Sequence, residues 1–267
     1  MKILVIGGGG REHAIIKKLA ESSKKPELYC APGNGGISED ATCVPFKATD
    51  KASAVKFAVD NKIDMVMVAP DDPLSIGMVD DLEAAGVRAF GPVAKAAQIE
   101  ASKVFSKALM KKYNIPTAEY EVFEDSEAAI EYLKRDQQQY PAVIKADGLA
   151  LGKGVIIAPD FDTACDAVKG MLDGGMFGKS GSRVVIEEFM TGPEVTVLAF
   201  TDGKTVKPMV SSQDHKRAFD GDKGPNTGGM GAFSPSMNYT DEIADVCMNT
   251  IFKPTVDALA AEGIKYK

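Results

Sequence analysis

The chain has 267 residues, of which 45% are apolar and 26% are charged, an ordinary composition for a domain that folds in water. Its formal net charge of −7 argues against a general nucleic-acid binder, because contacts with a phosphate backbone need a basic face. No apolar run approaches the roughly 20 residues that cross a bilayer, and the four cysteines are too far apart for a thiolate zinc site. We therefore expect a cytoplasmic protein with reduced thiols and with neither nucleic-acid nor membrane partners.

Residues 1–92 alternate between short apolar runs and segments in which apolar side chains have helical spacing. Strands are predicted over residues 3–6, 28–31, 65–69 and 87–90, with helices over residues 11–22, 54–59 and 80–85. This alternation indicates a parallel sheet with helical crossovers, that is, an α/β domain. Ligands of such a sheet bind beyond the carboxyl ends of its strands, where residues 7–10, 31–34 and 70–73 lie in this sequence.

A long helix is predicted over residues 95–113, and the pattern beyond it is that of an α+β fold. Strands are predicted over residues 121–123, 142–145, 155–158 and 184–187, and helices over residues 126–135, 163–172 and 241–261. The two strands that flank a glycine-rich turn at residues 146–154 indicate antiparallel pairing. Asp202 and Gly203 predict a hairpin between strands 194–201 and 204–210. Residues 264–267 resemble the start of one more strand, so we expect the fold to be incomplete as given.

Glycines at residues 7–10, followed by Arg11, Glu12 and His13, connect the first predicted strand to the first helix. Backbone amides at such a helix start can hold an anion, and Arg11 would add charge-assisted hydrogen bonds to a phosphate. A dinucleotide fingerprint would need glycine in place of Glu12 and an acidic residue after the second strand, where residues 31–33 are Ala-Pro-Gly. A phosphate or phosphosugar site and a tight turn without a ligand stay open, and a nicotinamide site is disfavoured.

Residues 142–155 combine a predicted strand that ends at Lys145, a glycine loop and a returning strand. Lysine supplies a point charge for phosphate oxygens, and glycines allow the loop to approach them and to close over them. Residues 184–190 end a further strand in Glu-Glu-Phe-Met, whose backbone could bind an adenine edge, and Glu194 could accept hydrogen bonds from both ribose hydroxyls. A single strand lysine is more often solvated, but the ordered set predicts a nucleotide site.

This ordered set resembles the nucleotide clamp of the ATP-grasp superfamily. More narrowly, the chain resembles the phosphoribosylamine–glycine ligases (glycinamide ribonucleotide synthetases) from end to end. The motifs that carry the resemblance are Val-Ile-Gly-Gly-Gly-Gly-Arg-Glu-His at 5–13, Ala-Pro-Gly-Asn at 31–34, Phe-Gly-Pro at 90–92, Glu-Ala-Ser-Lys at 100–103, Ile-Lys-Ala-Asp-Gly-Leu-Ala at 144–150, Ser-Gln-Asp-His-Lys-Arg at 212–217 and Gly-Pro-Asn-Thr-Gly-Gly-Met-Gly-Ala at 224–232. The last two motifs are the most specific.

The resemblance implies a fold of two domains. Residues 1–102 would form a parallel-sheet, pre-ATP-grasp α/β domain that binds substrate, and residues 103–118 a linking helix. Residues 119–190 would form the small subdomain of an α+β ATP-grasp domain, and residues 191–267 the start of its large subdomain, which is incomplete.

The resemblance also implies a ligation in two steps in de novo purine biosynthesis. ATP would phosphorylate the carboxylate of glycine, and the amine of 5-phosphoribosylamine would attack this acyl phosphate, giving glycinamide ribonucleotide, ADP and phosphate. Mg²⁺ (or Mn²⁺) accompanies ATP in this reaction. The family's metal ligands come from a later Glu-Phe-Asn run and a preceding acidic strand, which we expect beyond Lys267. The chain alone should therefore have little or no activity.

Site residues follow from the same resemblance. The implied ATP-binding residues are Lys103, Lys145, Gly148, Gly152, Lys153, Gly154, Glu187, Glu188, Phe189, Met190 and Glu194. The implied catalytic residues, close to the acyl phosphate, are Asp214, His215, Lys216 and Arg217. The implied substrate-binding residues are Gly9, Gly10, Arg11, Glu12, Pro32, Gly33, Asn34, Asn226, Thr227, Gly228 and Gly229. Residues 69–73 read Ala-Pro-Asp-Asp-Pro where the family typically has Gly-Pro-Glu before a small residue and proline, so substrate contacts of that loop stay open.

Three other functions compete with this interpretation. Another ATP-grasp carboxylate–amine ligase, such as a formate- or carbonate-using purine enzyme, would share the nucleotide site and differ in its acceptor. A binding module without catalysis would keep only the ligand of the first domain. A nicotinamide dehydrogenase is disfavoured by Glu12 and by the second strand, which lacks an acidic end.

Overall fold

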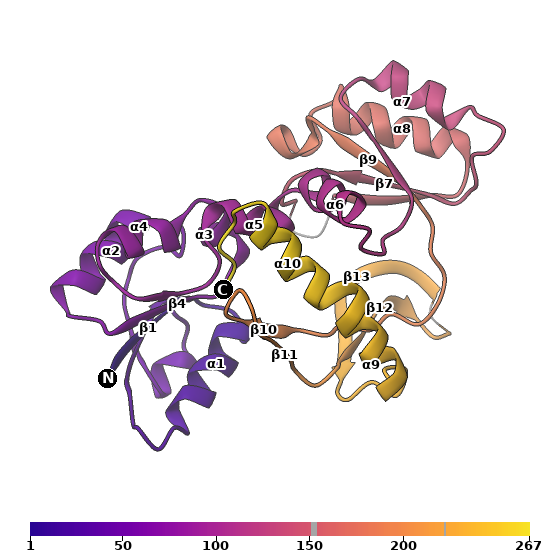
Figure 1. Cartoon of the computed structure of the whole chain (residues 1–267). Helices are drawn as coiled ribbons and strands as arrows, with labels where there is room; N and C mark the ends of the chain where they lie inside the picture. Colours follow the sequence, from indigo (N-terminus) through magenta and orange to yellow (C-terminus); the bar gives the residue numbers. More distant parts are fainter. Residues whose placement is uncertain (151–153, 222) are drawn as a thin grey trace. The chain divides into compact units, whose positions relative to one another are not determined.

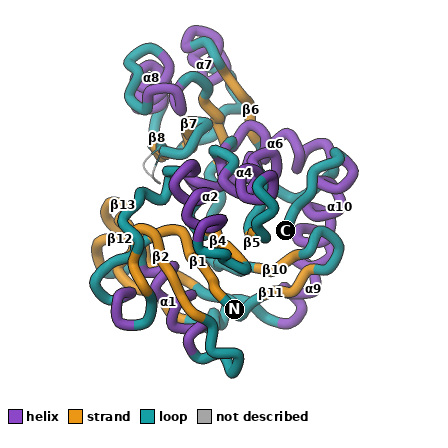
Figure 2. Tube along the Cα trace, turned by 90° about the vertical axis from the view of Figure 1, so that its left-hand side faces the viewer, coloured by secondary structure: helices purple, strands orange, loops and turns teal. Residues whose placement is uncertain are grey.

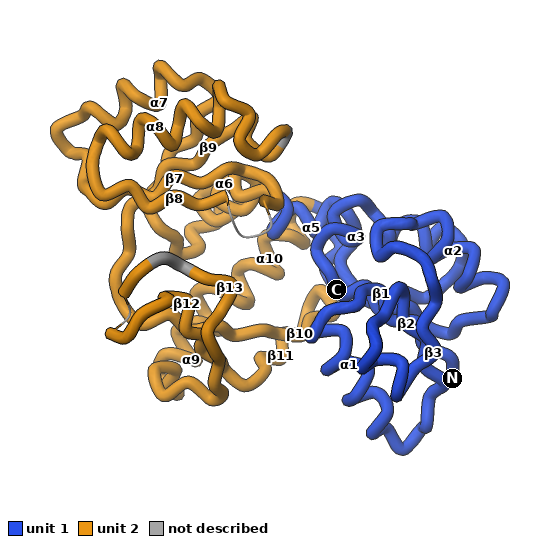
Figure 3. The backbone as a smooth tube through the Cα atoms, turned by 180° about the vertical axis from the view of Figure 1, so that it is seen from behind, with its two compact units in different colours: residues 1–101, 263–267 blue, residues 102–262 orange. Residues whose placement is uncertain are grey.

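A computed structural model describes residues 1–150, 154–221 and 223–267, and the chain divides into two compact units (Figures 1 and 3). The first unit contains residues 1–101 and 263–267, and the second contains residues 102–262. The domain limits predicted at residues 102, 118 and 190 stay predictions. Within the described ranges, no helix is long and apolar enough to cross a membrane.

The first unit contains a five-stranded parallel sheet in the order β3-β2-β1-β4-β5, which confirms the predicted α/β fold. Its strands are β1 (Lys2–Gly7), β2 (Glu27–Pro32), β3 (Thr42–Cys43), β4 (Met65–Val68) and β5 (Ala89–Phe90). Its helices are α1 (Gly10–Ala20), the 3₁₀ turn η1 (Ile37–Glu39), α2 (Lys51–Asp60), α3 (Asp71–Ser75), α4 (Met78–Ala84) and α5 (Ala94–Ala101).

The apolar run of β1 is buried on both faces, as expected for the central strand of a parallel sheet. Leu4 lies in one core cluster with Leu82 of α4, whereas Val5 lies in a second cluster with Ile16 of α1. Strand alternation therefore anchors β1 to helices on both sides of the sheet. The glycine loop that follows β1 starts from this fixed strand.

The long helix predicted over residues 95–113 is wrong, because the structure divides it into α5 and α6 (Lys103–Lys112). Ser102 separates them with an extended backbone (φ −136°, ψ 112°). Its hydroxyl accepts a hydrogen bond from Phe105 N at 3.1 Å, so Ser102 is the N-cap of α6. The interruption places Lys103 in the first turn of a new helix.

The second unit contains a four-stranded antiparallel sheet in the order β6-β9-β7-β8, which confirms the predicted antiparallel pairing. Its strands are β6 (Tyr120–Phe123), β7 (Ala142–Ala146), β8 (Val155–Ala158) and β9 (Val184–Glu188). Helices α7 (Ser126–Leu133) and α8 (Phe161–Leu172) lie side by side against this sheet (Figures 1 and 2). Ile144 of β7 and Ile186 of β9 point toward them into one core.

The remaining part of the second unit is built from two hairpins and a helix. The hairpin predicted at Asp202 and Gly203 is confirmed, with shorter strands β10 (Ala199–Thr201) and β11 (Val206–Pro208). The hairpin of β12 (Gln213–Phe219) and β13 (Lys223–Phe233) was not predicted, because β13 is rich in glycine and contains proline, which strands disfavour.

The predicted last helix consists of α9 (Asp241–Cys247), a π-helical turn η3 (Met248–Phe252) and α10 (Lys253–Ala261). The π turn precedes Pro254, which cannot donate a backbone hydrogen bond in a regular helix. The strand predicted to start at residues 264–267 is wrong. These described residues have no regular structure, and Lys265 and Lys267 form ion pairs with Glu83 in the first unit.

The N-cap of α8 predicts a contribution to stability that depends on pH. The Asp160 carboxylate accepts a hydrogen bond from Thr163 N at 2.8 Å, and this bond, with the Thr163 hydroxyl, lowers the pKa of Asp160. A carboxyl group with a lowered folded pKa stabilises the fold above its unfolded pKa of about 4. This contribution is lost as the pH falls through the folded pKa.

We therefore expect Asp160→Ala to lower the melting temperature by roughly 2–4 °C at pH 7. The loss should shrink as the pH falls from 5 to 3, whereas Asp160→Asn, which can still cap the helix, should melt close to the wild type at pH 7. Thermal unfolding followed by circular dichroism measures both variants. A loss for Asp160→Ala that stays constant over this pH range would contradict the assigned cap.

Candidate functional site

The first unit places a glycine loop at the carboxyl ends of β1 and β2. Gly9 is the N-cap of α1, and its amide donates to Glu12 Oε2 at 2.6 Å. Asn34 Nδ2 donates to Gly8 O at 2.9 Å and so joins the loop after β2 to the loop after β1. A Cβ on Gly8 would lie 2.7 Å from Gly33 O, so this approach of two backbones requires glycine.

This end of the sheet brings together the substrate residues predicted in the first unit, which are Gly9, Gly10, Arg11, Glu12, Pro32, Gly33 and Asn34. Gly10 and Arg11 are exposed in the first turn of α1, where free backbone amides favour an anion. Within the described part of the chain, Glu12 Oε1 and His13 Nε2 are buried without a hydrogen-bond partner. Such atoms are uncommon in folded proteins, and a ligand could satisfy them.

The loop that departs from the family pattern, residues 69–73, forms the start of the short helix α3. Pro70 is its N-cap, and Asp71 and Asp72 lie in its first turn. Carboxylates are favourable at a helix N-terminus, and they oppose the binding of an anion there. The acidic pair therefore stabilises a local helix at this end of the sheet.

In the second unit, strand alternation places Lys145 of β7 and Glu187 of β9 on the face of the sheet opposite α7 and α8. Lys145 Nζ lies 2.8 Å from Glu187 Oε2. Lys107 Nζ, from α6, lies 3.2 Å from the same oxygen. One buried carboxylate therefore holds two ammonium groups, and sequence reasoning found Lys145 and Glu187 but missed Lys107.

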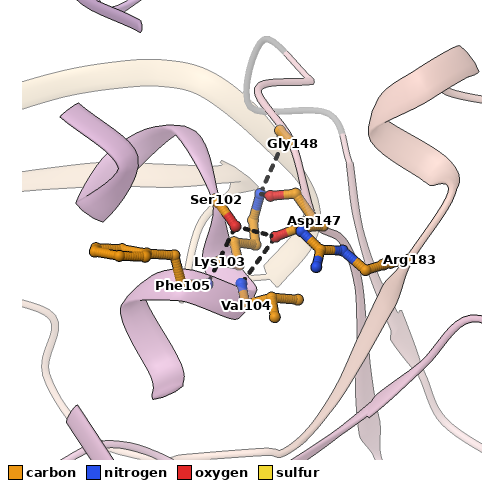
Figure 4. A network of polar contacts seen from close by, with 7 residues as sticks. All are labelled: Ser102, Lys103, Val104, Phe105, Asp147, Gly148 and Arg183. Carbon is orange, nitrogen blue, oxygen red and sulfur yellow. Dashed lines mark hydrogen bonds and ion pairs between the residues drawn. The ribbon is translucent and has the colours of Figure 1, made fainter. Parts of the chain in front are cut away.

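A second buried carboxylate, Asp147, joins the start of α6 to the end of β7 (Figure 4). Its Oδ1 accepts hydrogen bonds from Ser102 Oγ at 2.9 Å and from Val104 N at 2.8 Å. Its Oδ2 pairs with Arg183, which precedes β9. Sequence reasoning missed this network, because partners that lie far from Asp147 in the sequence leave no spacing pattern.

The Asp147 network also sets the position of Lys103, a predicted ATP-binding residue. Lys103 N donates to Asp147 O at 3.1 Å, and Lys103 Nζ donates to Gly148 O at 3.1 Å (Figure 4). The first lysine of the predicted site therefore lies beside the first glycine of the predicted loop.

The glycine loop itself is described only in part, because predicted residues Gly152 and Lys153 lie outside the described residues. A Cβ on Gly148 would overlap the hydroxyl of Ser180. A Cβ on Gly154 would lie 2.7 Å from the Cβ of Ala150, so the two ends of the loop both need glycine for packing.

The predicted adenine hinge follows β9. Glu188 N donates to Glu119 O at 3.1 Å, and Glu188 Oε1 accepts from Glu119 N at 3.0 Å, which fixes the end of the strand. Phe189 and Met190 are exposed, whereas Glu187 is buried in its lysine pair. Glu194, the predicted ribose residue, is exposed and forms an ion pair with Lys216 of β12.

The predicted catalytic motif and the second substrate motif meet on one hairpin. The residues on β12 are Asp214, His215, Lys216 and Arg217, and those on β13 are Asn226, Thr227, Gly228 and Gly229. Thr227 Oγ1 donates to Lys216 O at 2.9 Å, and Arg217 Nη1 donates to Gly224 O at 2.7 Å. Two motifs that are separate in sequence therefore form one surface.

The hairpin carries charged side chains and a small hollow. The hydrogen bond with Glu194, supported by the charges of Glu194 and Asp214, raises the pKa of Lys216 above its ordinary value. The imidazole of His215 stacks on Phe233 with ring centroids 5.5 Å apart. A hollow of about 300 Å³ is lined by His215, Arg217, Ala218, Phe219, Asp220, Gly221 and Met230.

The Asp147 network predicts a large loss of stability when its carboxylate is removed. Asp147→Ala leaves Arg183, Ser102 Oγ and Val104 N without their acceptor, so we expect a loss of about 2–4 kcal/mol in the free energy of unfolding. Asp166→Ala, at an exposed position of α8, should change stability by less than about 0.5 kcal/mol. Urea unfolding of both variants measures the difference, and equal losses would contradict the network's contribution.

Comparison with known proteins identifies the family. The chain matches the phosphoribosylglycinamide synthetase N domain over residues 1–100 and the phosphoribosylglycinamide synthetase ATP-grasp (A) domain over residues 101–267. It is 47% identical over 266 residues to the phosphoribosylamine–glycine ligase of Clostridium acetobutylicum and 50% identical over 268 residues to that of Allochromatium vinosum. All of this chain is covered in both cases, but it spans only 64% and 62% of the lengths of these relatives.

Comparison with solved structures supports the same family. The fold matches the crystal structure of phosphoribosylamine–glycine ligase from Thermotoga maritima with a TM-score of 0.83 and 31% identity, over 100% of this chain and 63% of that one. It also matches the biotin carboxylase domain of a 2-oxoglutarate carboxylase from Hydrogenobacter thermophilus, with a TM-score of 0.76 over 99% of this chain and 58% of that one. At 15% identity, the second likeness shows the fold alone. The chain belongs to the phosphoribosylglycinamide synthetase family, as its motifs predict.

Proposed function

We propose that the chain is the nucleotide- and substrate-binding part of an ATP-dependent ligase that joins glycine to 5-phosphoribosylamine in purine biosynthesis. The products are glycinamide ribonucleotide, ADP and phosphate. The observation that carries this proposal is the gathering of Lys103, Lys145 and a glycine loop around β7 in a chain of this family. The cytoplasm is the proposed location.

In the proposed reaction, a carboxylate oxygen of glycine attacks the γ-phosphorus of ATP, and ADP leaves. The amine nitrogen of 5-phosphoribosylamine then attacks the carbonyl carbon of the glycyl phosphate. Phosphate leaves, and the amine loses a proton as the amide forms. Phosphoryl transfer of this kind depends on positioning and on neutralisation of charge more than on a protein nucleophile. Two lysine ammonium groups beside a glycine loop would supply both.

The nucleotide would bind along β7 and β9. Lys103 and Lys145 contact its phosphates, and the backbone after Glu188 offers hydrogen bonds to adenine, beside the exposed Phe189 and Met190. Glu194 accepts the ribose hydroxyls. The exposure of Glu194 supports this role, because its ion pair with Lys216 can open at little cost.

The hairpin of β12 and β13 would hold the developing acyl phosphate. Arg217 and Lys216 supply positive charge, and the hollow beside His215 has room for a small anion. The phosphate of 5-phosphoribosylamine would bind the amide of Gly10 and the side chain of Arg11, in the first turn of α1. The buried Glu12 Oε1, which lacks a partner among the described residues, can accept a hydrogen bond from a substrate hydroxyl or amine.

Mg²⁺ (or Mn²⁺) is the proposed companion of ATP in the whole enzyme. Across the described ranges, no group of three or more His, Cys, Asp or Glu side chains could hold a metal ion. The described residues therefore do not fit a dedicated metal site. We place its ligands in the part of the relatives' length that this chain does not span.

Removal of the Lys145 charge tests the nucleotide site. We expect Lys145→Met to weaken ATP binding about tenfold to a hundredfold, the size of a lost charge-assisted hydrogen bond to phosphate. Lys169→Met, at an exposed position of α8 on the other face of the sheet, should bind ATP like the wild type. Isothermal titration calorimetry measures both affinities. Equal ATP affinity of wild type and Lys145→Met would rule out the assigned phosphate contact.

Turnover tests the ligase assignment. Because this chain spans only 62–64% of its relatives and its described residues form no metal cluster, we expect ADP release at least about a hundredfold slower than that of the Thermotoga maritima relative. The release should depend on both glycine and 5-phosphoribosylamine. Release that depends on formate or bicarbonate in place of glycine would favour another carboxylate–amine ligase. Turnover as fast as the relative's would contradict the expected loss of rate.

A further inference from the structure

Lys107 is a buried cation that lies one helical turn after Lys103 on α6. Its ammonium donates to Thr117 Oγ1 at 2.8 Å and to Ala118 O at 3.1 Å, and it lies 3.2 Å from Glu187 Oε2. A lysine ammonium has three donor hydrogens, so these three acceptors satisfy it completely. Its side chain is only 9% exposed, and burial lowers the pKa of Lys107 while Glu187 opposes the shift.

Lys145 holds the same carboxylate oxygen in a different way. Its ammonium lies 2.8 Å from Glu187 Oε2, and its side chain is 27% exposed. Among the described residues, Lys145 contacts no acceptor other than Glu187, so it has donor hydrogens and solvent access available for a second anion. Lys107, in contrast, is also held by a backbone and a side-chain acceptor. Of the two ammonium groups, Lys145 can leave the carboxylate and Lys107 is fixed.

The charge balance around Glu187 explains why a fixed lysine beside an exposed one would assist ligand binding. A buried carboxylate that loses its counter-ion is strongly destabilised. If Lys145 were the sole partner of Glu187, an anionic ligand that bound the Lys145 ammonium would leave the buried carboxylate without a counter-ion. Lys107 removes the penalty, because Glu187 stays paired after Lys145 turns away.

We propose that Lys107 is a positioning residue for nucleotide binding: it acts as the permanent counter-ion of Glu187 and frees Lys145 to bind the polyphosphate of the nucleotide. This inference rests on the proposed function, which assigns Lys145 to the phosphates. A purely structural ion pair would instead affect all nucleosides and nucleotides alike, because its loss would distort the site as a whole.

The test compares ATP with adenosine, which lacks phosphates. In Lys107→Met, Lys145 becomes the sole counter-ion of Glu187, so ATP affinity should fall about tenfold to a hundredfold. Adenosine affinity should change by less than about threefold, since adenosine does not need the Lys145 ammonium. Lys111→Met is the matched control, because Lys111 is an exposed lysine one turn further along α6, and it should leave both affinities unchanged.

Neutralising the carboxylate should reverse the effect. In Lys107→Met with Glu187→Gln, Lys145 no longer pairs with a charge, and the ratio of ATP to adenosine affinity should return to within about threefold of the wild type. Calorimetric titration of each variant measures the ratio. Equal losses for ATP and adenosine in Lys107→Met, or a ratio that the second substitution does not restore, would overturn the role of Lys107.

Two further outcomes are decisive. If circular dichroism shows that Lys107→Met does not fold, Glu187→Gln is compared with the double variant. Once Glu187 is neutral, loss of Lys107 should alter ATP affinity by less than about threefold, and a tenfold loss would contradict the inference.

A wild-type chain that binds adenosine but not ATP overturns the proposed phosphate site itself, and with it this inference. ATP binding that is intact in Lys107→Met overturns the inference alone.

Discussion

The second unit depends on how it neutralises two carboxylates that it buries, Glu187 and Asp147. An unpaired buried charge would destabilise the fold by roughly several kcal/mol, so each carboxylate needs cations or hydrogen-bond donors beside it. Glu187 takes two lysines, and Asp147 takes an arginine, a hydroxyl and a backbone amide. The partners come from α6, β7 and the chain near β9, so the charges tie these segments together. The same segments carry the predicted phosphate-binding lysines.

The interruption between α5 and α6 follows from the same requirement. A continuous helix through Ser102 would use the amides of Lys103 and Val104 for its own hydrogen bonds. The break at Ser102 frees them, and Asp147 accepts from Val104 N through its carboxylate and from Lys103 N through its backbone carbonyl. Helix α6 therefore starts against the end of β7, and Lys103 is held beside Gly148. The residues around Ser102 are good helix formers, but the buried contact with Asp147 interrupts the helix at this point.

Local sequence patterns predict the apolar strands of this fold, but they do not predict its buried polar contacts between distant segments. Continuous apolar runs predicted the parallel sheet, because a strand covered on both faces must be apolar throughout. Family motifs brought Lys103, Lys145 and the β12 residues into one hypothesis. Lys107 could not be found in this way, because an isolated lysine in an amphipathic helix normally lies on the solvated face. Only the fold brings Thr117, Ala118 and Glu187 around its ammonium.

The exposure of an ion pair in this unit determines whether a ligand can open it. The pair of Lys216 and Glu194 has side chains that are 41% and 58% exposed, so solvent screens it and it is worth about 0–1 kcal/mol. A ligand could open it and take both groups. The pair of Lys107 and Glu187 is almost completely buried and stays closed under the same competition. Lys145 shares the buried carboxylate but is 27% exposed. This intermediate exposure fits the role proposed for Lys145, which pairs with Glu187 in the absence of ligand and with the phosphates when the nucleotide binds.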